Sequence, residues 1–354
     1  MPFISKIQRQ TDYNRFPPST PIVIDNGASY FRIGWAGETE PRVIFRNIVQ
    51  RPRHKSTGET VTIVGDHDPA LLKYFDCTRS GPRSAFDSNV VFQFEIMEYV
   101  LDFAFDRLGA NGSRIDHPIL ITECVCNPVH SRSKMAELLF ETYGVRSVAF
   151  GVDAVFSYKY NQLHGICEKD GLAICPGFTT THVIPEIDPT FVPKPEPTAS
   201  QPAATEVPHV RPLTKEDFQI VLGVERFRCP EILFHPNLVG IDQVGLDEMT
   251  GVSIRRLPSK DKALANRLTS SVFMTGGCSL FPGINERLEA GIRMLQPCGS
   301  PIKVVRALDP VLDAWRGASL YAANSRFHQQ TFSRSDYYEK GEDWLRQYQV
   351  RYTL

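Results

Sequence analysis

Residues 21–42 (PIVIDNGASYFRIGWAGETEPR) place an acidic, glycine-bearing turn directly between two strand-like segments. The apolar run at 21–24 is typical of a buried strand, and strand-like character resumes at 30–35. The residues between them predict the tip of a β-hairpin. If Gly27 takes a positive φ, the backbone N–H groups around it converge on an anion, and Asp25 is suited to a hydrated divalent cation. The alternative is an ordinary tight hairpin, because Asp-Asn-Gly turns are common in hairpins.

A second glycine-rich turn lies at 270–288 (SSVFMTGGCSLFPGINERL), where a predicted strand leads through Gly276 and Gly277 into a helix that starts near residue 283. Glycines have no side chain, so a ligand can approach their backbone closely, and a helix N-terminus favours negative charge. This turn suits contact with a base and with phosphate groups. Two such turns favour a nucleotide-binding cleft over two unrelated hairpins.

The hydrophobic pattern along the chain predicts an α/β fold. Strands near 21–35 and 117–123 alternate with helical patterns at 94–108, 131–143, 283–295 and 309–327. Gly109 and Gly144 directly follow the last apolar turn of two helices, as expected at helix C-termini. Asp309 and Pro310 are predicted as the N-cap and first helical position of the last helix.

The charge balance limits the choice of partners. The chain of 354 residues has 39 basic and 40 acidic residues, a formal net charge of −1, so no global field draws it toward DNA. Contact with nucleic acid therefore has to be local. One candidate patch is Arg51, Arg53, His54 and Lys55, and a second is Arg255 and Arg256, although runs this short are more often a solvated face. With 42% hydrophobic residues, the chain can bury one large or two medium cores.

Eight cysteines lie mostly inside apolar runs and form no C-x-x-C pair, which indicates a reducing compartment. Cys124 and Cys126 lie two apart on a predicted strand and would point the same way, as at the start of a metal site. No His or Cys pair follows at zinc spacing, so buried thiols are the favoured interpretation. The polar N-terminus and the lack of an apolar run of about 18 residues predict an intracellular protein without a signal peptide or membrane span.

Five further stretches, at 116–128, 134–145, 225–240, 315–327 and 333–345, accompany the two turns. Together with the turns, and in this order, they resemble the actin and actin-related protein family over most of the chain. The resemblance implies the actin-like, ribonuclease-H-like two-lobed ATPase fold of the α/β class. Much of that fold's fourth subdomain has no counterpart in the printed chain.

Residues 185–212 break the α/β pattern at the place where the resemblance puts the fourth subdomain. They hold eight of the 26 prolines and show no periodicity, so they predict an extended linker or surface segment. Either the chain is shortened here or a long insertion is omitted, and omission is the favoured interpretation. The domains expected from the resemblance are an N-terminal extension (1–20), a first lobe with subdomains 1 and 2 (21–165), the second phosphate turn region (166–184), the Pro-rich junction (185–212), a second lobe with subdomain 3 and remnants of 4 (213–305), and a C-terminal return to the first lobe (306–354).

Within the family, two features look most like the fifth class of nuclear actin-related proteins. One is TECVCNP at 122–128, and the other is the second phosphate turn at 175–179, which departs from the actin pattern. This likeness implies a nuclear, non-catalytic scaffold subunit of the INO-eighty chromatin remodelling complex, which helps couple the remodeller motor to nucleosomal DNA or histones. The implied partners are the remodeller motor subunit, a small dedicated partner subunit, the RuvB-like AAA ATPases and the nucleosome, with no membrane and no actin-type filament. The alternative is a nucleotide-hydrolysing, actin-like conformational switch.

The resemblance also assigns residues to the first phosphate turn and to the base side of the site. Asp25, Asn26 and Gly27 match the family in the first turn, whereas Arg32 replaces a phosphate-contacting lysine and Ala28 replaces a serine. The base-side wall is assigned to Gly276, Gly277, Leu280 and Phe281.

The second phosphate turn falls at 175–179 and departs from the family. Both of its carboxylates are replaced, Pro176 removes one N–H donor, and Phe178 stands where a hydrated cation would lie. Gly177 and Thr179 remain as candidate phosphate contacts.

Three further positions bear on hydrolysis. His182 matches a water-orienting histidine, although a lone histidine here is more often structural; Asp153 replaces a water-positioning glutamine, and Val311 replaces an adenine-stacking lysine. Loss of such positioning groups removes transition-state stabilisation, so no catalytic residue and no useful ATPase activity are expected. The sequence leaves open whether ATP or ADP is bound and whether Mg²⁺ accompanies it; a bound nucleotide would have a structural role.

Overall fold

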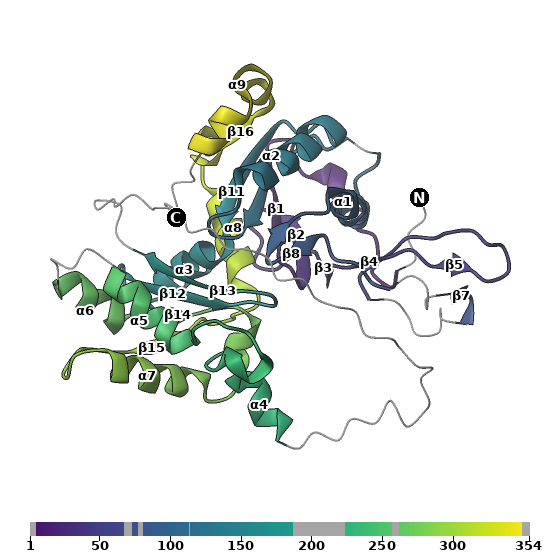
Figure 1. Ribbon diagram of the computed structural model, residues 1–354. Coiled ribbons are helices and arrows are strands. Elements are labelled where there is room, and N and C mark those ends of the chain that lie inside the picture. Colours follow the sequence, from purple (N-terminus) through teal and green to yellow (C-terminus); the bar gives the residue numbers. More distant parts are fainter. Residues whose placement is uncertain are drawn as a thin grey trace.

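The computed structural model describes residues 5–66, 73–76, 81–112, 114–186, 224–256 and 262–348. These residues form two α/β lobes, each built on its own sheet, with a pair of helices between the sheets (Figure 1). The predicted two-lobed α/β architecture is confirmed.

The first lobe holds a six-stranded mixed sheet in the order β16-β11-β10-β1-β2-β3. Its strands are β1 (Ile22–Asn26), β2 (Tyr30–Trp35), β3 (Val43–Arg46), β10 (Ile119–Glu123), β11 (Ser147–Val152) and β16 (Phe332–Ser333). β1, β10 and β11 run parallel to one another, whereas the other pairings are antiparallel. The strands predicted near 21–35 and 117–123 are confirmed, and β16 brings the C-terminal part of the chain back to this sheet.

The second lobe holds a four-stranded sheet in the order β13-β12-β14-β15. β12 (Gly171–Pro176) and β13 (Thr181–Glu186) form an antiparallel hairpin, and β14 (Val272–Met274) and β15 (Val304–Arg306) continue the sheet in parallel. Each sheet thus joins a hairpin to parallel strands beside it. The hairpin tips, at 27–29 and 177–180, therefore occupy equivalent places in the two lobes.

Two helices, α3 (Asp153–Leu163) and α8 (Asp313–Ala323), pack against each other between the sheets (Figure 1). Gly317 permits this close approach, because a Cβ at that position would lie 2.2 Å from the carbonyl oxygen of Phe156. Trp315 is fully buried, and its Nε1 donates to the carbonyl oxygen of Val23 in β1 at 3.1 Å. The helix pair is therefore fixed to the first sheet.

The period-two alternation of β1 assigns its side chains to two different cores. Ile22 and Ile24 face the core that contains α1 (Phe94–Leu108) and α2 (Val129–Glu137), whereas Val23 faces α3 and α8. In the second lobe, α5 (Leu246–Arg256), α6 (Lys262–Ser270) and α7 (Ile284–Leu295) pack on the four-stranded sheet. Each lobe has its own core, so the contact between the lobes is a separate feature.

Short elements decorate the first lobe. A small arm contains β4 (Val49–Gln50), β5 (Arg53–His54), β6 (Ile63–Val64) and β7 (Phe75–Asp76), and β8 (Phe86–Asp87) pairs with β9 (Val90–Val91). The remaining helices are α4 (Glu225–Glu231), α9 (Arg334–Gln347), a π-helical turn (Leu138–Thr142) that continues α2, and 3-10 turns at Tyr13–Arg15, Pro236–Val239, Gly277–Leu280 and Phe327–Gln330.

Most of the predicted helix ends are confirmed, with one correction. Gly109 and Gly144 follow their helices with φ of 99° and 62°, in the left-handed region that glycine adopts readily. The last helix, predicted at 309–327 with Asp309 and Pro310 at its start, is shorter at both ends, because α8 runs from Asp313 to Ala323. Asp309 instead caps the turn before the helix, where its Oδ1 accepts the N–H groups of Val311 and Leu312 at 3.0 and 3.2 Å.

The prediction that Cys124 and Cys126 share one face of a strand is wrong. β10 ends at Glu123, and Cys126 has a φ of 57°, so the chain turns between the two cysteines. Cys124 is buried and Cys126 is exposed. No helix among the described residues is long and apolar enough to cross a membrane. Apart from Pro185 and Glu186, the Pro-rich segment predicted at 185–212 lies outside the described residues.

Replacing Gly317 with alanine is expected to destabilise the protein, because the added Cβ would force α3 and α8 apart. Overpacking of this kind costs about 2 kcal/mol, and the melting temperature is expected to fall by roughly 4 °C or more. Gly81→Ala is the matched control, since a Cβ there would meet nothing within 4 Å. Equal melting temperatures for the two variants would contradict the close helix contact.

Candidate functional site

A cleft of about 300 Å³ opens between the two hairpin tips. The first hairpin supplies its tip and Arg32, the second supplies Gly177, Phe178 and His182, and the turn at 275–278 closes the base. The N-terminal part of α8 and the turn before it complete the wall. The cleft therefore lies where the two lobes meet, above the helix pair that joins them.

The predicted site residues separate into three groups by position. Six line the cleft: Asp25, Gly27, Arg32, Gly177, Gly276 and Gly277. Asn26 lines a smaller adjoining cavity, and Thr179 lies exposed at the tip of the second hairpin. Leu280 and Phe281 do not line the cleft and are 48% and 36% exposed. Leu280 is the last residue of the 3-10 turn that begins at Gly277, and Phe281 follows this turn.

Asp25 and Arg32 form a buried ion pair close to the tip of the first hairpin. They are partners in the antiparallel register, and Arg32 Nη1 donates to Asp25 Oδ2 at 2.7 Å. The other carboxylate oxygen, Oδ1, accepts the hydroxyl of Thr122 in β10 at 2.9 Å. Both carboxylate oxygens of Asp25 therefore accept hydrogen bonds from protein donors. The positive charge of the Arg32 guanidinium beside this carboxylate also disfavours a divalent cation there.

Two glycines shape the cleft in different ways. Gly27 does not take the positive φ predicted for it, since its backbone lies outside the left-handed region. A side chain would be crowded there instead, because a Cβ would lie 3.0 Å from the carbonyl oxygen of Tyr30. Gly276 does have a positive φ, 88°, and a Cβ there would lie 2.9 Å from the carbonyl oxygen of Pro176.

Side chains of the two lobes meet across the mouth of the cleft. The Arg46 guanidinium, at the end of β3, lies 5.4 Å from the ring centroid of Tyr30 and 5.8 Å from that of Phe178. Arg46 and Tyr30 belong to the first lobe, whereas Phe178 is the 65% exposed residue at the tip of the second hairpin. Cation–π contact of this kind contributes about 0.5–1 kcal/mol at exposed sites. The first lobe therefore contacts the second hairpin directly.

A second contact between the lobes involves His182. Its Nε2 lies 3.2 Å from Asn89 Nδ2 of the first lobe and 3.2 Å from Thr180 Oγ1 of its own hairpin. Burial lowers the pKa of His182, so the neutral imidazole is favoured and Nε2 accepts the Asn89 amide. Asn89 was not predicted as a site residue; its φ of 67° in the β8–β9 turn is the local feature that directs it here.

Asp153 carries the most perturbed carboxyl in the cleft. Burial, and then the negative charge of Asp25, raise its pKa to about 7, while the backbone N–H of Ala154 opposes the shift by donating to Oδ1 at 2.7 Å. The side chain lies at the first position of α3, where the cleft meets the smaller cavity. Near neutral pH this carboxyl is therefore only partly ionised.

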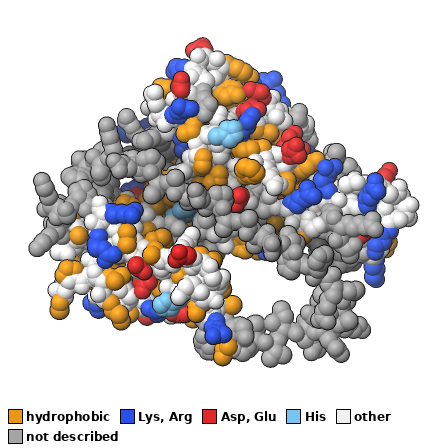
Figure 2. Space-filling model, in the orientation of Figure 1, with side chains coloured by type: hydrophobic (Ala, Val, Ile, Leu, Met, Phe, Trp, Pro, Cys, Tyr) orange, Lys and Arg blue, Asp and Glu red, His pale blue; other side chains and the backbone are white. Residues whose placement is uncertain are grey.

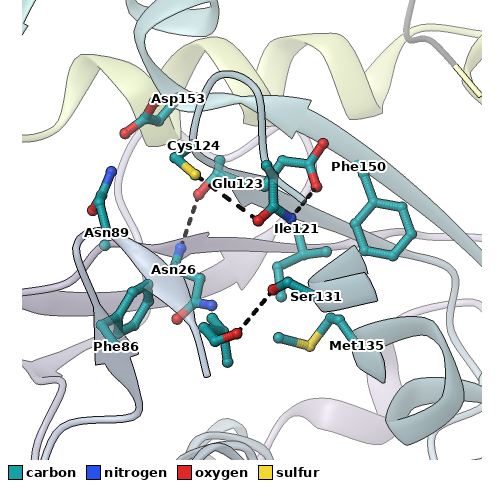
Figure 3. Close-up of a pocket in the computed structure, with 14 residues that line it drawn as sticks. Asn26, Phe86, Asn89, Ile121, Glu123, Cys124, Ser131, Met135, Phe150 and Asp153 are labelled. Atoms are coloured by element: carbon teal, nitrogen blue, oxygen red, sulfur yellow. Dashed lines mark hydrogen bonds between the residues drawn. The ribbon is translucent and has the colours of Figure 1, made fainter. Parts of the chain in front are cut away.

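The smaller cavity, of about 30 Å³, adjoins the cleft beneath the first hairpin (Figure 3). Asn26, Cys124 and Asp153 face it, and burial raises the pKa of the Cys124 thiol to about 12, so the thiol is protonated at neutral pH. A space of this size has room for one water molecule. It therefore extends the cleft only slightly and does not offer a second ligand site.

Comparison with known proteins identifies the family. A model of the actin family matches residues 17–206 and 194–349. The chain therefore belongs to the actin family.

The curated relatives show which members of the actin family this chain resembles. The chain is 38% identical over 722 aligned residues to "Actin-related protein 5" of Arabidopsis thaliana, covering 99% of this chain and 100% of that protein. It is 53% identical over 171 residues to "Actin-related protein 5" of Oryza sativa subsp. indica, covering 48% of this chain and 29% of that protein, and 40% identical over 179 residues to the human "Actin-related protein 5", covering 49% and 28%.

Length differences accompany these matches. The alignment with the Arabidopsis relative runs over 722 positions, whereas this chain has 354 residues, so about half of those positions have no residue of this chain. The matches to the rice and human relatives span less than a third of those proteins. The two family matches meet at 194–206, inside the Pro-rich segment.

The nucleotide chemistry of the family can be tested against these residues. Among the residues that the structure describes, no three His, Cys, Asp or Glu side chains gather in a way that would hold a metal ion. Asp25 is paired with Arg32, and the second hairpin presents Phe178 in place of a carboxylate. Few protein ligands for a divalent cation therefore remain in the cleft, and its glycine-lined backbone leaves room for part of a nucleotide.

We expect Arg32→Met to destabilise the protein strongly, because it leaves the buried carboxylate of Asp25 without its counter-ion. Breaking one side of a buried pair costs about 3 kcal/mol or more, and the melting temperature should fall accordingly. The double variant Asp25→Asn/Arg32→Met removes both charges and should recover most of the loss. A single variant as stable as the wild type would contradict a buried pair.

Asp153 is expected to make stability depend on pH. Its pKa is raised from 3.8 to about 7 on folding, so between these values the folded state binds more protons than the unfolded state. The stability that Asp153 contributes is therefore full at low pH and is lost as the pH rises toward 7. Asp153→Asn should lack this loss and should gain melting temperature relative to the wild type between about pH 5 and pH 8.

Glu186 titrates in the same range, because burial raises its pKa to about 7 as well. Glu186 is present in both the wild type and Asp153→Asn. Its contribution therefore cancels in the difference between their melting temperatures, measured side by side at each pH. A difference between them that stays constant with pH would show that Asp153 is ionised throughout.

Proposed function

We propose that this protein is a non-catalytic, actin-related scaffold subunit of a nuclear, ATP-dependent chromatin remodelling complex of the INO-eighty type. Its similarity to proteins named "Actin-related protein 5" supports the class, and the geometry of the cleft supports the non-catalytic role. In this role it helps couple the remodeller motor to the nucleosome. Its neighbours would be the motor subunit, a small dedicated subunit and the RuvB-like ATPases.

The observation that carries this proposal is the contact of the two lobes through the protein's own side chains. Arg46 reaches Phe178, and Asn89 reaches His182, across the mouth of the cleft. At the base, the hydroxyls of Ser157 in α3 and Thr275 after β14 lie 2.8 Å apart. A nucleotide-driven switch needs the ligand to hold the lobes together, whereas here the chain supplies that contact itself.

The groups needed for hydrolysis are engaged elsewhere. Phosphoryl transfer to water depends on positioned metal ions and on a residue that orients the attacking water. Asp25 is committed to Arg32 and Thr122, and His182 is committed to Asn89 and Thr180. Asp153 would place a partly ionised carboxyl beside a triphosphate. ATP or ADP, where bound, therefore acts as a structural ligand that stabilises the folded lobes.

The rival function, a nucleotide-hydrolysing switch, makes the opposite prediction. Nucleotide extracted from the purified protein by acid is identified by chromatography, and added ATP is followed under single-turnover conditions with and without Mg²⁺. We expect no conversion of ATP to ADP by the protein, and any bound ATP should stay intact. Conversion that depends on Mg²⁺ and is lost in His182→Ala would establish the switch instead.

We propose that the small arm formed by β4 to β7 contacts nucleosomal DNA. Lys and Arg side chains gather over this arm, at the right of Figure 2. The arm carries the predicted patch of Arg51, Arg53, His54 and Lys55, and the exposed Arg83 pairs with Val49 of β4 beside it. The second predicted patch, Arg255 and Arg256, lies in the last turn of α5, where the helix dipole accounts for basic residues.

The double variant Arg53→Ala/Arg83→Ala is expected to weaken binding to duplex DNA and to lower the salt slope of the binding constant by about 2. Each neutralised phosphate releases counterions, so each lost contact reduces that slope. The control is Arg255→Ala/Arg256→Ala, which should bind as the wild type does. Fluorescence anisotropy over a salt series measures both, and an effect confined to the control would move the DNA contact to α5.

A further inference from the structure

A broad groove on the first lobe lies outside the cleft and shares no lining residue with it. Its volume is about 640 Å³, and its walls are α1, α2 with the following π-helical turn, and the end of the β8–β9 hairpin. α1 and α2 lie beside each other in the upper lobe of Figure 1. Neither the nucleotide chemistry nor the basic arm accounts for this groove.

Several residues that line the groove are apolar, and one of them is an exposed aromatic residue. Phe92 is 72% exposed, and Phe94 and Leu138 beside it are only partly buried. A large apolar side chain exposed in a concave surface marks a binding site more often than an isolated surface residue does. Hydrophobic, acidic and basic side chains are interspersed over this lobe in Figure 2.

The rim of the groove is acidic on both sides. Glu95 and Glu98, three residues apart on α1, form one side, and Glu137 and Glu141 form the other. The cations in the groove are fewer: Lys134 is paired with Glu137 at 2.7 Å, and His130 has an exposed side chain. Negative charge therefore remains in excess, which disfavours nucleic acid and favours a cationic partner.

The helix that forms one wall is irregular at the groove. The α-helix ends at Glu137 and continues as a π-helical turn from Leu138 to Thr142, and Leu138, Glu141 and Thr142 all line the groove. π-helical turns are uncommon and are frequently found at functional sites. Here the irregular turn brings an apolar and an acidic side chain to the same wall.

We propose that this groove binds a basic, amphipathic helical segment of a partner protein. The apolar face of the segment would pack on Phe92 and Leu138, and its Lys or Arg residues would pair with the glutamates of the rim. An amphipathic helix in an apolar groove is a recurring mode of recognition, and its charged flanks set the orientation. The inference stands apart from the nucleotide cleft and from the DNA patch.

The test uses the full chain and a fluorescent synthetic helix with leucine on one face and lysine on the other. We expect saturable binding by fluorescence anisotropy that weakens as NaCl rises from about 50 to about 300 mM, because salt screens the rim charges. Phe92→Ser and, separately, Glu95→Gln/Glu98→Gln should each weaken binding by about tenfold, which corresponds to about 1.4 kcal/mol. The same helix with glutamate in place of lysine should not bind.

The control variant is Tyr338→Ser, which removes another exposed aromatic residue, 66% exposed on α9, and should leave binding unchanged. Equal binding by the wild type and both groove variants would overturn the proposal. So would self-association of the wild type that Phe92→Ser abolishes, since the occupant would then be a second copy of this chain. DNA binding should be unchanged in the groove variants, so failure here is distinguishable from failure of the proposed function.

Discussion

The packing of α3 against α8 is the contact on which the cleft depends. Both helices lie between the two sheets, and Gly317 lets their backbones approach closely enough to bury Trp315 and Phe156. Asn161 Nδ2 donates to Asp313 Oδ2 at 2.9 Å, and Asn161 Oδ1 accepts the N–H of Leu308 at 2.8 Å, so the buried polar groups of this contact are satisfied. Because β1 and β12 pack beside these helices, their position sets the distance between the two hairpin tips.

On this base, side-chain contacts at the cleft join the two lobes. The Arg32 guanidinium holds Asp25, and contacts from Arg46 and Asn89 reach the second lobe. Each contact is weak on its own. Because the helix pair already aligns the two lobes, forming these contacts costs little further conformational entropy. These contacts support the proposal that the protein acts as a fixed scaffold.

Local sequence signals predicted the first hairpin, the glycine turn at 276–277 and the helices near 94–108, 131–143, 283–295 and 309–327, because each depends on a few neighbouring residues. The second hairpin, at 171–186, was not predicted. The partners of Asp25 were not predicted, since Thr122 comes from a strand 97 residues away and the pairing with Arg32 depends on side-chain direction. The contact of Asn89 with His182 joins two lobes and has no local signal beyond a turn. Leu280 and Phe281 were assigned to the base-side wall by the family resemblance, but they do not line the cleft, because the chain forms a 3-10 turn from Gly277 to Leu280 there.

The most direct test of the central claim is the distance between the lobes, measured by pulsed electron paramagnetic resonance. One spin label would be placed on the exposed Ile44 of β3 and the other on the exposed Thr179 of the second hairpin, in the full chain. The account predicts one narrow distance distribution that is the same without nucleotide, with ATP, and with ATP and Mg²⁺. A broad distribution without nucleotide that narrows or shifts when ATP and Mg²⁺ are added would contradict it and would show that the ligand holds the lobes together.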